Sequence, residues 1–136
     1  MGRLFVIDLE GNSYSCKHCK TPLALANDLI SESIQGRQAG RRTYLFNNVV
    51  NVTFGQEEQR EMIGGLHTVV DMFCVSCGFD VGWKFLSAQQ QTEQYKVGKF
   101  ILERFKLLGP DGRPCGPPRV TWGPDPEPYR RNRNRD

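Results

Sequence analysis

The pattern of hydrophobic and polar positions along the chain predicts a protein built mainly from β-strands. Residues 43–55 are rich in Tyr, Val and Phe, and Val50, Val52 and Phe54 share one face at a period of two residues. The segment GGLHTVVDMFC, residues 64–74, alternates in the same way, so successive side chains face opposite sides of a sheet. Strands are predicted for residues 3–8, 43–55, 64–74, 79–85 and 98–107.

The chain shows little helical periodicity. Only residues 87–96, SAQQQTEQYK, indicate a helix, and it is a short one. The charged segment GQEEQREM, residues 55–62, is interpreted as a turn or loop. Consecutive strands without long helices between them favour antiparallel pairing. The predicted fold class is therefore mainly β, with antiparallel sheets.

Composition divides the chain near Leu108. All eight Phe residues lie between Phe5 and Phe105, while seven of the eight Pro residues lie after position 109. Segments rich in Pro, Gly and Arg do not bury enough apolar surface to fold. We therefore expect one domain over residues 1–108, followed by a disordered tail over residues 109–136.

Charge follows the same division. Residues 1–108 carry 12 Lys and Arg against 11 Asp and Glu, a net charge of +1, and the tail carries six Arg against four acids, a net charge of +2. A nucleic-acid-binding domain normally presents a basic face, so the nearly neutral domain argues against that function. The basic cluster of the tail suits contact with RNA, a membrane surface or an import receptor, but a solvated tail is the favoured interpretation. This cluster comprises Arg130, Arg131, Arg133 and Arg135.

No hydrophobic run approaches the 18 or so residues of a membrane span. The apolar run near the start, Leu4 to Ile7, is too short for the hydrophobic region of a secretory signal. We therefore expect a soluble, intracellular protein with no membrane partner.

Two pairs of cysteines carry the strongest chemical signal in the sequence. Cys16 and Cys19 form one C-x2-C motif, Cys74 and Cys77 form another, and 54 residues separate the pairs. Four thiolates in two such pairs are a typical tetrahedral ligand set for structural zinc. Because the separation is long enough to contain a sheet, one zinc would join distant parts of a single domain. Gly78 follows the second pair and tolerates the positive φ that such a knuckle requires.

Two other interpretations of these thiols stay open at this point. A C-x2-C motif can be a thioredoxin-like redox pair, although such pairs normally accompany a βαβ pattern that this sequence lacks. Disulfides require an oxidising compartment, which an intracellular location does not supply. The fifth cysteine, Cys115, lies in the tail without the fixed, electropositive surroundings of a catalytic thiol, so we expect it to be a spare thiol.

The sequence lacks common catalytic motifs. It contains no H-E-x-x-H, P-loop or G-x-S-x-G motif, and the predicted domain has no cysteine beyond the four candidate ligands. A catalytic zinc keeps an open coordination position, whereas four thiolates close it. Neither His18 nor His67 is then needed as a ligand, and His67 suits either the core or the wall of a pocket.

Four further segments accompany the cysteine pairs: YLFNNVVNV (44–52), GLHTVVD (65–71), VGWK (81–84) and YKVGKFILE (95–103). With them, the chain resembles the Yippee-like proteins, a family of small zinc-binding proteins of eukaryotes. The resemblance covers residues 13–103, and its details are similar to those of plant members.

The resemblance implies a β-tent fold, in which a four-cysteine zinc site pins two antiparallel sheets. The drug-binding domain of cereblon and methionine sulfoxide reductase B share this fold. A pocket with aromatic walls is also implied, with Trp83 as its main wall and Tyr44, Phe46 and His67 as further candidates. Yippee-like proteins are linked to ubiquitin ligase assemblies and to nuclear or centrosomal locations. Ubiquitin ligase subunits are therefore the implied partners, in the nucleus or cytoplasm.

The sequence and the resemblance leave three candidate functions for this protein. The favoured one is a non-enzymatic protein-interaction module with one structural Zn2+, which recognises substrates for a ubiquitin ligase or assists its assembly. The alternative is a nucleic-acid-binding zinc module, which the charge of the domain opposes. The third is an enzyme of the sulfoxide-reductase kind, which requires a redox-active cysteine that the domain lacks outside the candidate zinc site.

Overall fold

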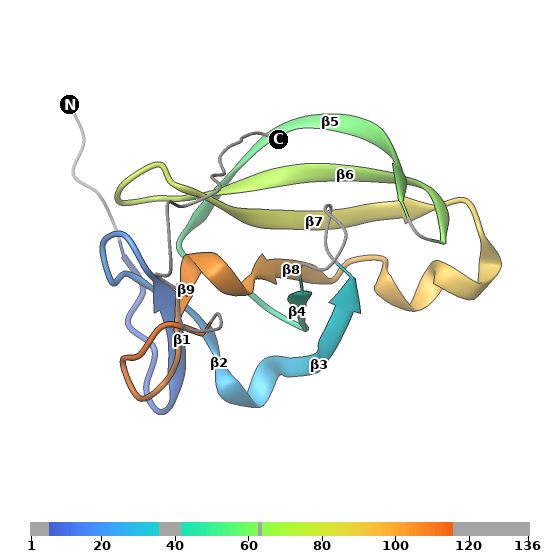
Figure 1. Ribbon diagram of the computed structural model, residues 1–136. Helices are drawn as coiled ribbons and strands as arrows, with labels where there is room; N and C mark the ends of the chain where they lie inside the picture. The colour runs from blue at the N-terminus through green and yellow to red at the C-terminus, as the bar shows by residue number, and fades with distance from the viewer. Residues whose placement is uncertain (1–5, 36–41, 63, 116–136) are drawn as a thin grey trace, which may run out of the picture.

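Two antiparallel β-sheets form the fold (Figure 1). The computed structural model describes residues 6–35, 42–62 and 64–115. A small sheet has the strand order β2-β1-β9, and a large sheet has the order β3-β4-β8-β7-β6-β5. The small sheet contains β1 (Ser13–Cys16), β2 (Pro22–Leu25) and β9 (Leu107–Leu108). The large sheet contains β3 (Leu29–Gln35), β4 (Arg42–Phe46), β5 (Val52–Met62), β6 (Gly65–Cys74), β7 (Asp80–Ala88) and β8 (Phe100–Glu103).

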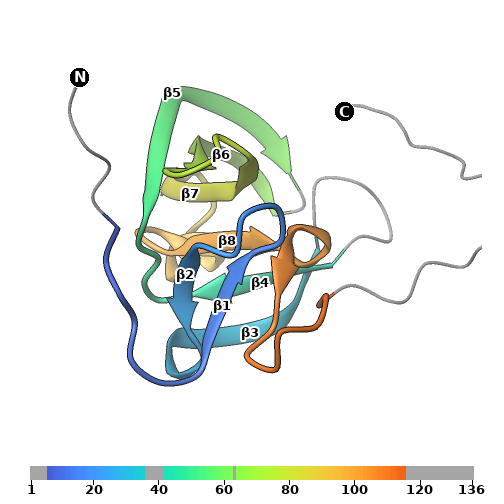
Figure 2. The ribbon, with the colours of Figure 1, turned by 90° about the vertical axis from the view of Figure 1, so that its left-hand side faces the viewer.

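The strands of the small sheet run across those of the large sheet at one end of the molecule (Figure 1). The large sheet is curved, with β5 at one margin and β3 at the other (Figure 2). Three short 3-10 helices connect strands: η1 (Ala26–Asp28), η2 (Gln91–Lys96) and η3 (Arg104–Lys106). The predicted class, mainly β with antiparallel sheets, is confirmed. Within the described residues, no helix is long and apolar enough to cross a membrane.

Two hydrophobic clusters lie on opposite faces of the large sheet. Successive side chains of a strand point to opposite faces, so Leu45 and Phe46 of β4 enter different clusters. The first cluster joins the two sheets and includes Cys16, Leu23, Phe46, Met72, Cys74, Leu102 and Leu107. The second contains Leu45, Val69, Trp83, Phe85 and Ile101.

The charged segment of residues 55–62 is a strand, and its assignment to a turn or loop was wrong. It forms most of β5, in which Glu57 pairs with Val70 and Glu61 with Leu66 of β6. Backbone N–H and C=O groups of β5 that face β6 form hydrogen bonds whatever the side chains are. Because β5 is an outer strand, its polar side chains stay in water. Local composition therefore did not decide the structure of this segment.

Other boundaries also differ from the predictions. Residues 6–8 of the predicted first strand are not in a strand, and residues 3–5 lie outside the described part. The predicted strand over residues 43–55 is two strands, β4 and β5, separated by a turn at Asn51. The predicted helix over residues 87–96 begins as the end of β7 and continues as η2. Strands β1, β2 and β3 were not predicted.

The described fold continues past Leu108 as far as Cys115. The backbone N–H of Cys115 donates to the carbonyl oxygen of Leu107 at 3.0 Å, and Pro114 forms an isolated bridge with Leu108. Cys115 packs against the first hydrophobic cluster. These contacts add seven residues to the expected domain, and residues 116–136 of the expected tail lie outside the described part.

Gly82 lies where β7 packs tightly against the backbone of β8, and its substitution by alanine is expected to destabilise the fold. A Cβ atom at this position would overlap the carbonyl oxygen of Ile101 and lie 3.1 Å from the Cα atom of Leu102. Because these are backbone atoms, relief requires movement of β8. We expect Gly82→Ala to lower the free energy of unfolding by about 1–3 kcal/mol, as overpacking does.

Urea denaturation of Gly82→Ala and Gly55→Ala checks this expectation. Gly55→Ala is the matched control, because its Cβ would meet the Phe73 ring at 3.3 Å, which can move, and the backbone oxygen of Asp71 only at an ordinary 3.9 Å. Equal stability losses in the two variants would show that β7 and β8 are not packed as closely as described.

Candidate metal centre

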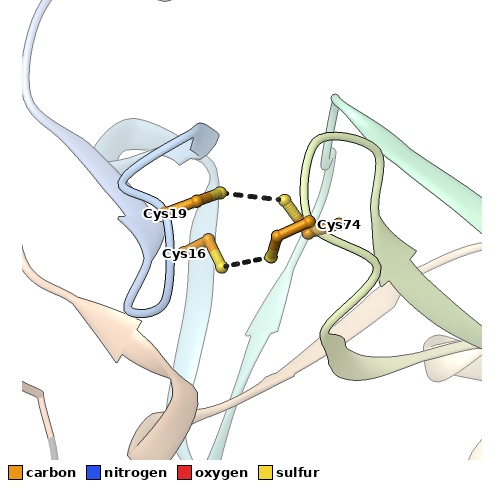
Figure 3. Close-up of side chains that lie close together, drawn as sticks. Cys16, Cys19 and Cys74 are labelled. Atoms are coloured by element: carbon orange, nitrogen blue, oxygen red, sulfur yellow. Dashed lines mark hydrogen bonds between the residues drawn. The ribbon is translucent and has the colours of Figure 1, made fainter.

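Two knuckles, one from each sheet, bring the four paired cysteines together. Cys16 ends β1 and Cys74 ends β6, and each is followed by a tight turn that contains the second cysteine of its motif. The Sγ atoms of Cys16 and Cys77 lie 3.7 Å apart, and those of Cys19 and Cys74 lie 3.4 Å apart. All four sulfur atoms lie within 4.8 Å of one another. Figure 3 shows the two knuckles facing each other across these sulfur atoms.

The two knuckles have the same backbone design. In the first, the N–H of Lys20 donates to the carbonyl of Cys16 at 2.7 Å, and in the second, the N–H of Gly78 donates to the carbonyl of Cys74 at 2.8 Å. The residue that closes each turn has a left-handed backbone conformation, with φ of 68° at Lys20 and 79° at Gly78. The sequence indicated this conformation at Gly78. Lys20, whose Cβ disfavours it, gave no such signal.

The sulfur geometry fits one tetrahedral zinc. With Zn–S bonds of about 2.3 Å, a tetrahedral site separates its sulfur atoms by about 3.8 Å, close to the 3.4 and 3.7 Å observed. These separations are far longer than the roughly 2.05 Å of a disulfide bond. The two short separations also join different motifs, whereas a redox pair would join the cysteines of one motif. The prediction of one structural zinc is confirmed by this cluster together with the family assignment given below.

The thiols of the cluster differ in acidity when no metal is bound. Burial raises the pKa of Cys16 to about 12, and burial also raises that of Cys77. Burial acts in the same direction on Cys19, but hydrogen bonds from the side chain and backbone of Thr21 and from neighbouring thiols outweigh it and lower its pKa to about 7. Of Cys16, Cys19 and Cys77, Cys19 is therefore the thiol that ionises most readily near neutral pH.

Zinc binding is expected to release protons. Zinc coordinates thiolates, whereas thiols of an unfolded chain, with pKa about 8.5, are mostly protonated at pH 7.5. Burial in the folded arrangement raises the pKa values of Cys16 and Cys77, so from either state protons must leave when the metal enters. At pH 7.5 we expect release of at least about two protons per zinc, and the apparent affinity should fall as the pH is lowered. Calorimetric titration of refolding metal-free protein in buffers of different ionisation enthalpy measures this number. A pH-independent affinity between pH 6 and 8 would contradict it.

Asn51 ties both knuckles and the N-terminal segment together. Its amide nitrogen donates to the carbonyl oxygens of Pro22, at 2.7 Å, and Ile7, at 2.9 Å, while its Oδ1 accepts from the N–H of Ile7 at 2.8 Å. Its own carbonyl accepts from the N–H of Val75, inside the second knuckle, at 2.9 Å. Asn51 has a φ of 63°, in the left-handed region that Asn tolerates better than most residues. The sequence analysis did not identify this residue, although an Asn in a predicted strand was a signal for a turn.

A hydroxyl contact joins the knuckles directly. The buried Thr21 hydroxyl lies 3.1 Å from the Cys19 sulfur and within hydrogen-bond distance, 2.8 Å, of the Ser76 hydroxyl. Partners of this kind fix the orientation of ligating sulfur atoms. Together with Asn51, they hold the ligands in place from both sheets.

The four-cysteine cluster suits a structural metal. Four cysteine ligands complete a tetrahedral site, so no coordination position is left for water or substrate. Among the described residues, Cys115 is the one cysteine outside the cluster. Burial raises its pKa, and the hydrogen bond with Tyr44 offsets only part of this effect. A thiol of raised pKa is a poor nucleophile at neutral pH, which argues against sulfoxide-reductase chemistry at Cys115.

The structure does not bring together the four residues expected to line a pocket. Trp83 and His67 are each 1% exposed and lie near Phe85, whose ring centroid is 6.3 Å from that of Trp83 and 5.2 Å from that of His67. Tyr44 and Phe46 face the other side of the large sheet, where both pack against Tyr14 at 5.4 and 5.3 Å. Trp83 is thus a core residue on one face, and Tyr44 and Phe46 belong to the other.

His67 is part of a buried polar cluster that involves η2. Its Nδ1 lies 2.9 Å from the carbonyl oxygen of Gly65, and its Nε2 lies 3.7 Å from Oε1 of Glu93. Glu93 is also paired with the buried Lys96. This cluster fastens η2 to the turn between β5 and β6. Glu93 and Lys96 were not singled out from the sequence, because only the fold places them beside His67.

Comparison with known proteins places this architecture in a family. The family described as "Yippee zinc-binding/DNA-binding /Mis18, centromere assembly" matches residues 13–109. A yippee-like protein of Arabidopsis thaliana is 62% identical over 82% of this chain and 86% of its own length. Protein yippee-like 4 of Homo sapiens is 46% identical over 74% of this chain and 77% of its own length.

The fold of a solved structure agrees with this assignment. The crystal structure of the Mis18 "Yippee-like" domain is similar with a TM-score of 0.54 at 16% identity, covering 71% of this chain and 91% of that chain. The expected resemblance to Yippee-like proteins, plant members among them, is confirmed. The chain belongs to the Yippee/Mis18 family of zinc-binding proteins.

Proposed function

We propose that the protein is a non-enzymatic interaction module whose two sheets are held in place by one structural zinc. The observation that carries this proposal is the closed cluster of four cysteines, two from each sheet. A metal with four protein ligands fixes the fold and leaves no position for a reaction. The surface of the domain, rather than the metal, then performs the function.

Exposed apolar side chains on the large sheet and η2 give this surface its contacts. Ile30 of β3 is 50% exposed, Phe54 of β5 is 50% exposed, and Tyr95 of η2 is 56% exposed. Aromatic residues in particular are enriched where proteins bind one another. These three residues are the natural first targets for mutation, because their substitution removes little core packing.

The partner that we propose belongs to a ubiquitin ligase assembly, in which the module recognises substrates or supports assembly. The likeness of the expected β-tent fold to the drug-binding domain of cereblon supports this choice. We further propose a nuclear or cytoplasmic location, where such assemblies act.

Affinity purification from plant cell extract, followed by mass spectrometry, tests the proposal. Intact protein should capture ligase subunits, and at least one of Ile30→Ala, Phe54→Ala and Tyr95→Ala should lose them with an unchanged melting temperature. Ser87→Ala, another exposed position on the large sheet, is the matched control and should retain the partners. The interaction proposal fails if intact protein captures nothing beyond what unfolded Cys74→Ser protein captures. A partner set without any ligase subunit defeats only the ligase assignment.

The description of the family also names DNA binding, and this supports a second candidate. Lys17 and Lys20, in the exposed first knuckle, would contact the phosphate backbone. Fluorescence anisotropy with duplex DNA distinguishes the two functions. For the interaction module we expect no binding at 150 mM salt. Binding that Lys17→Gln/Lys20→Gln weakens would instead favour the nucleic-acid function.

A further inference from the structure

Strand β5 forms one margin of the large sheet and leaves a free edge. It pairs with β6 on one side, and no strand of residues 6–35, 42–62 and 64–115 pairs with it on the other. At 11 residues it is the longest of the described strands, and residues 53–59 are exposed. Figure 2 shows β5 at the margin of the curved sheet. A long unpaired edge is a ready template for another strand, so its side chains determine what can pair there.

The side chains of β5 place an acidic row along one face of this edge. Glu57 pairs with Val70, Gln59 with Thr68 and Glu61 with Leu66, so the three lie on the same face at a period of two residues. All three are exposed. Neither Glu57 nor Glu61 forms an ion pair with a described residue. Their charge therefore faces solvent beside the free backbone edge.

The one cation of β5 is turned away from this row. Arg60 lies on the opposite face, where its Nη2 donates to Asp71 of β6 at 3.0 Å and its Nε donates to Glu58 at 3.1 Å. Its side chain is 17% exposed. Because Asp71 holds the guanidinium toward the body of the sheet, Arg60 does not neutralise Glu57 or Glu61 at the edge.

We propose that the free edge of β5 is a docking strand for an extended protein segment with arginine or lysine at every second position. Such a segment would complete an antiparallel ladder with the unpaired backbone groups. Its basic side chains would share one face and lie opposite the Glu57–Gln59–Glu61 row, where opposite charges stabilise cross-strand pairs. A second copy of β5 would instead place carboxylates near carboxylates, which disfavours pairing between copies. This inference rests on the proposed function and names the kind of partner segment.

The chain itself contains a sequence with the required alternation. Arg131, Arg133 and Arg135 are separated by Asn132 and Asn134. These residues lie outside the described part, but their sequence supplies a probe. If the chain's own arginines also reach the edge, they will compete with an added peptide, so the test must remove them.

Fluorescence anisotropy measures binding of a labelled peptide, PYRRNRNRD, the sequence of residues 128–136. The protein is the full chain with Arg130, Arg131, Arg133 and Arg135 replaced by Gln. We expect saturable binding that weakens about tenfold or more between 50 and 300 mM salt, because salt screens exposed charges. Glu57→Gln/Glu61→Gln in the same chain should weaken it at least about fivefold. The matched control, Glu10→Gln/Glu32→Gln, removes two exposed charges elsewhere and should bind as before.

Two further measurements separate strand pairing from general charge attraction. A peptide of the same composition with consecutive arginines, PYRRRRNND, should bind more weakly, because only half of its arginines can face the acidic row. Hydrogen exchange should slow at amides of β5 when PYRRNRNRD binds. Tighter binding by the Arg-to-Gln chain than by the unmodified chain would show that the chain's own arginines compete for the edge, which also supports the proposal.

The proposal is overturned if PYRRNRNRD does not bind, or if PYRRRRNND binds as tightly as PYRRNRNRD. It is also overturned if Glu57→Gln/Glu61→Gln does not weaken the binding of PYRRNRNRD. Slowed exchange confined to strands other than β5 also overturns it. These failures are distinct from failure of the proposed function. If β5 does not bind the peptide but partners are still captured through Ile30 or Tyr95, the interaction module stands and only the β5 edge is excluded.

Discussion

Replacing Cys74 by serine is expected to unfold the domain as well as abolish zinc binding. Cys74 is 1% exposed and lies where β6 of the large sheet meets the knuckle of the small sheet. Structural zinc contributes about 10–16 kcal/mol of apparent binding free energy in small modules. This equals or exceeds the roughly 5–15 kcal/mol net stability of a typical domain. Losing one of four ligands should therefore remove the margin that keeps the sheets together.

Elemental analysis and circular dichroism during heating measure this effect. The unmodified protein should contain one zinc per chain and melt cooperatively, whereas Cys74→Ser should contain none and show no cooperative transition. Cys115→Ser is the matched control, because it removes a thiol that is not in the cluster, and it should keep its zinc. A metal-free Cys74→Ser protein that melts like the unmodified protein would refute a structural role for the metal.

Removing the side chain of Asn51 is expected to have the second largest effect. Asn51→Gly keeps the left-handed backbone accessible and deletes the three side-chain hydrogen bonds to Ile7 and Pro22. At about 1 kcal/mol per bond, the free energy of unfolding should fall by about 3 kcal/mol. The free energy of unfolding of Asn51→Ala should be about 1 kcal/mol lower still, because alanine disfavours a φ of 63°.

The position of Asn51 between the knuckles also predicts a metal phenotype. Loss of a residue that orients a metal site commonly weakens metal affinity about 10- to 100-fold. Competition with a chromophoric chelator measures this for Asn51→Gly. Asn47→Ala is the matched control, since its exposed side chain accepts one hydrogen bond from Lys99, and both its stability and its zinc affinity should stay near those of the unmodified protein. A stability loss in Asn51→Gly with unchanged zinc affinity would confine Asn51 to holding the N-terminal segment.

The sequence by itself determined the candidate metal ligands and the β class. Cys16, Cys19, Cys74 and Cys77 were identifiable because two C-x2-C motifs supply four thiolates, and this donor set suits one metal geometry. The strands that alternate most clearly, such as β6, were also identifiable, because one face of each is buried. In both cases the deciding information is local: a donor spacing or a period of two.

Only the tertiary structure decided the features that depend on neighbours. The charged residues of β5 form a strand because β6 lies beside them, and no local pattern reports that pairing. Trp83 and Tyr44 share an aromatic character that suggested one pocket, but they face opposite sides of the large sheet.

The same holds for residues whose role is to connect distant segments. Asn51 reaches Ile7, Pro22 and Val75 only because the fold gathers an N-terminal segment and two knuckles around one turn. Glu93 meets His67 because η2 packs on the turn between β5 and β6. Cys115 joins the core because its backbone bonds to β9. Hydrogen bonds and packing between residues far apart in sequence fixed these positions, and composition or periodicity carries no record of them.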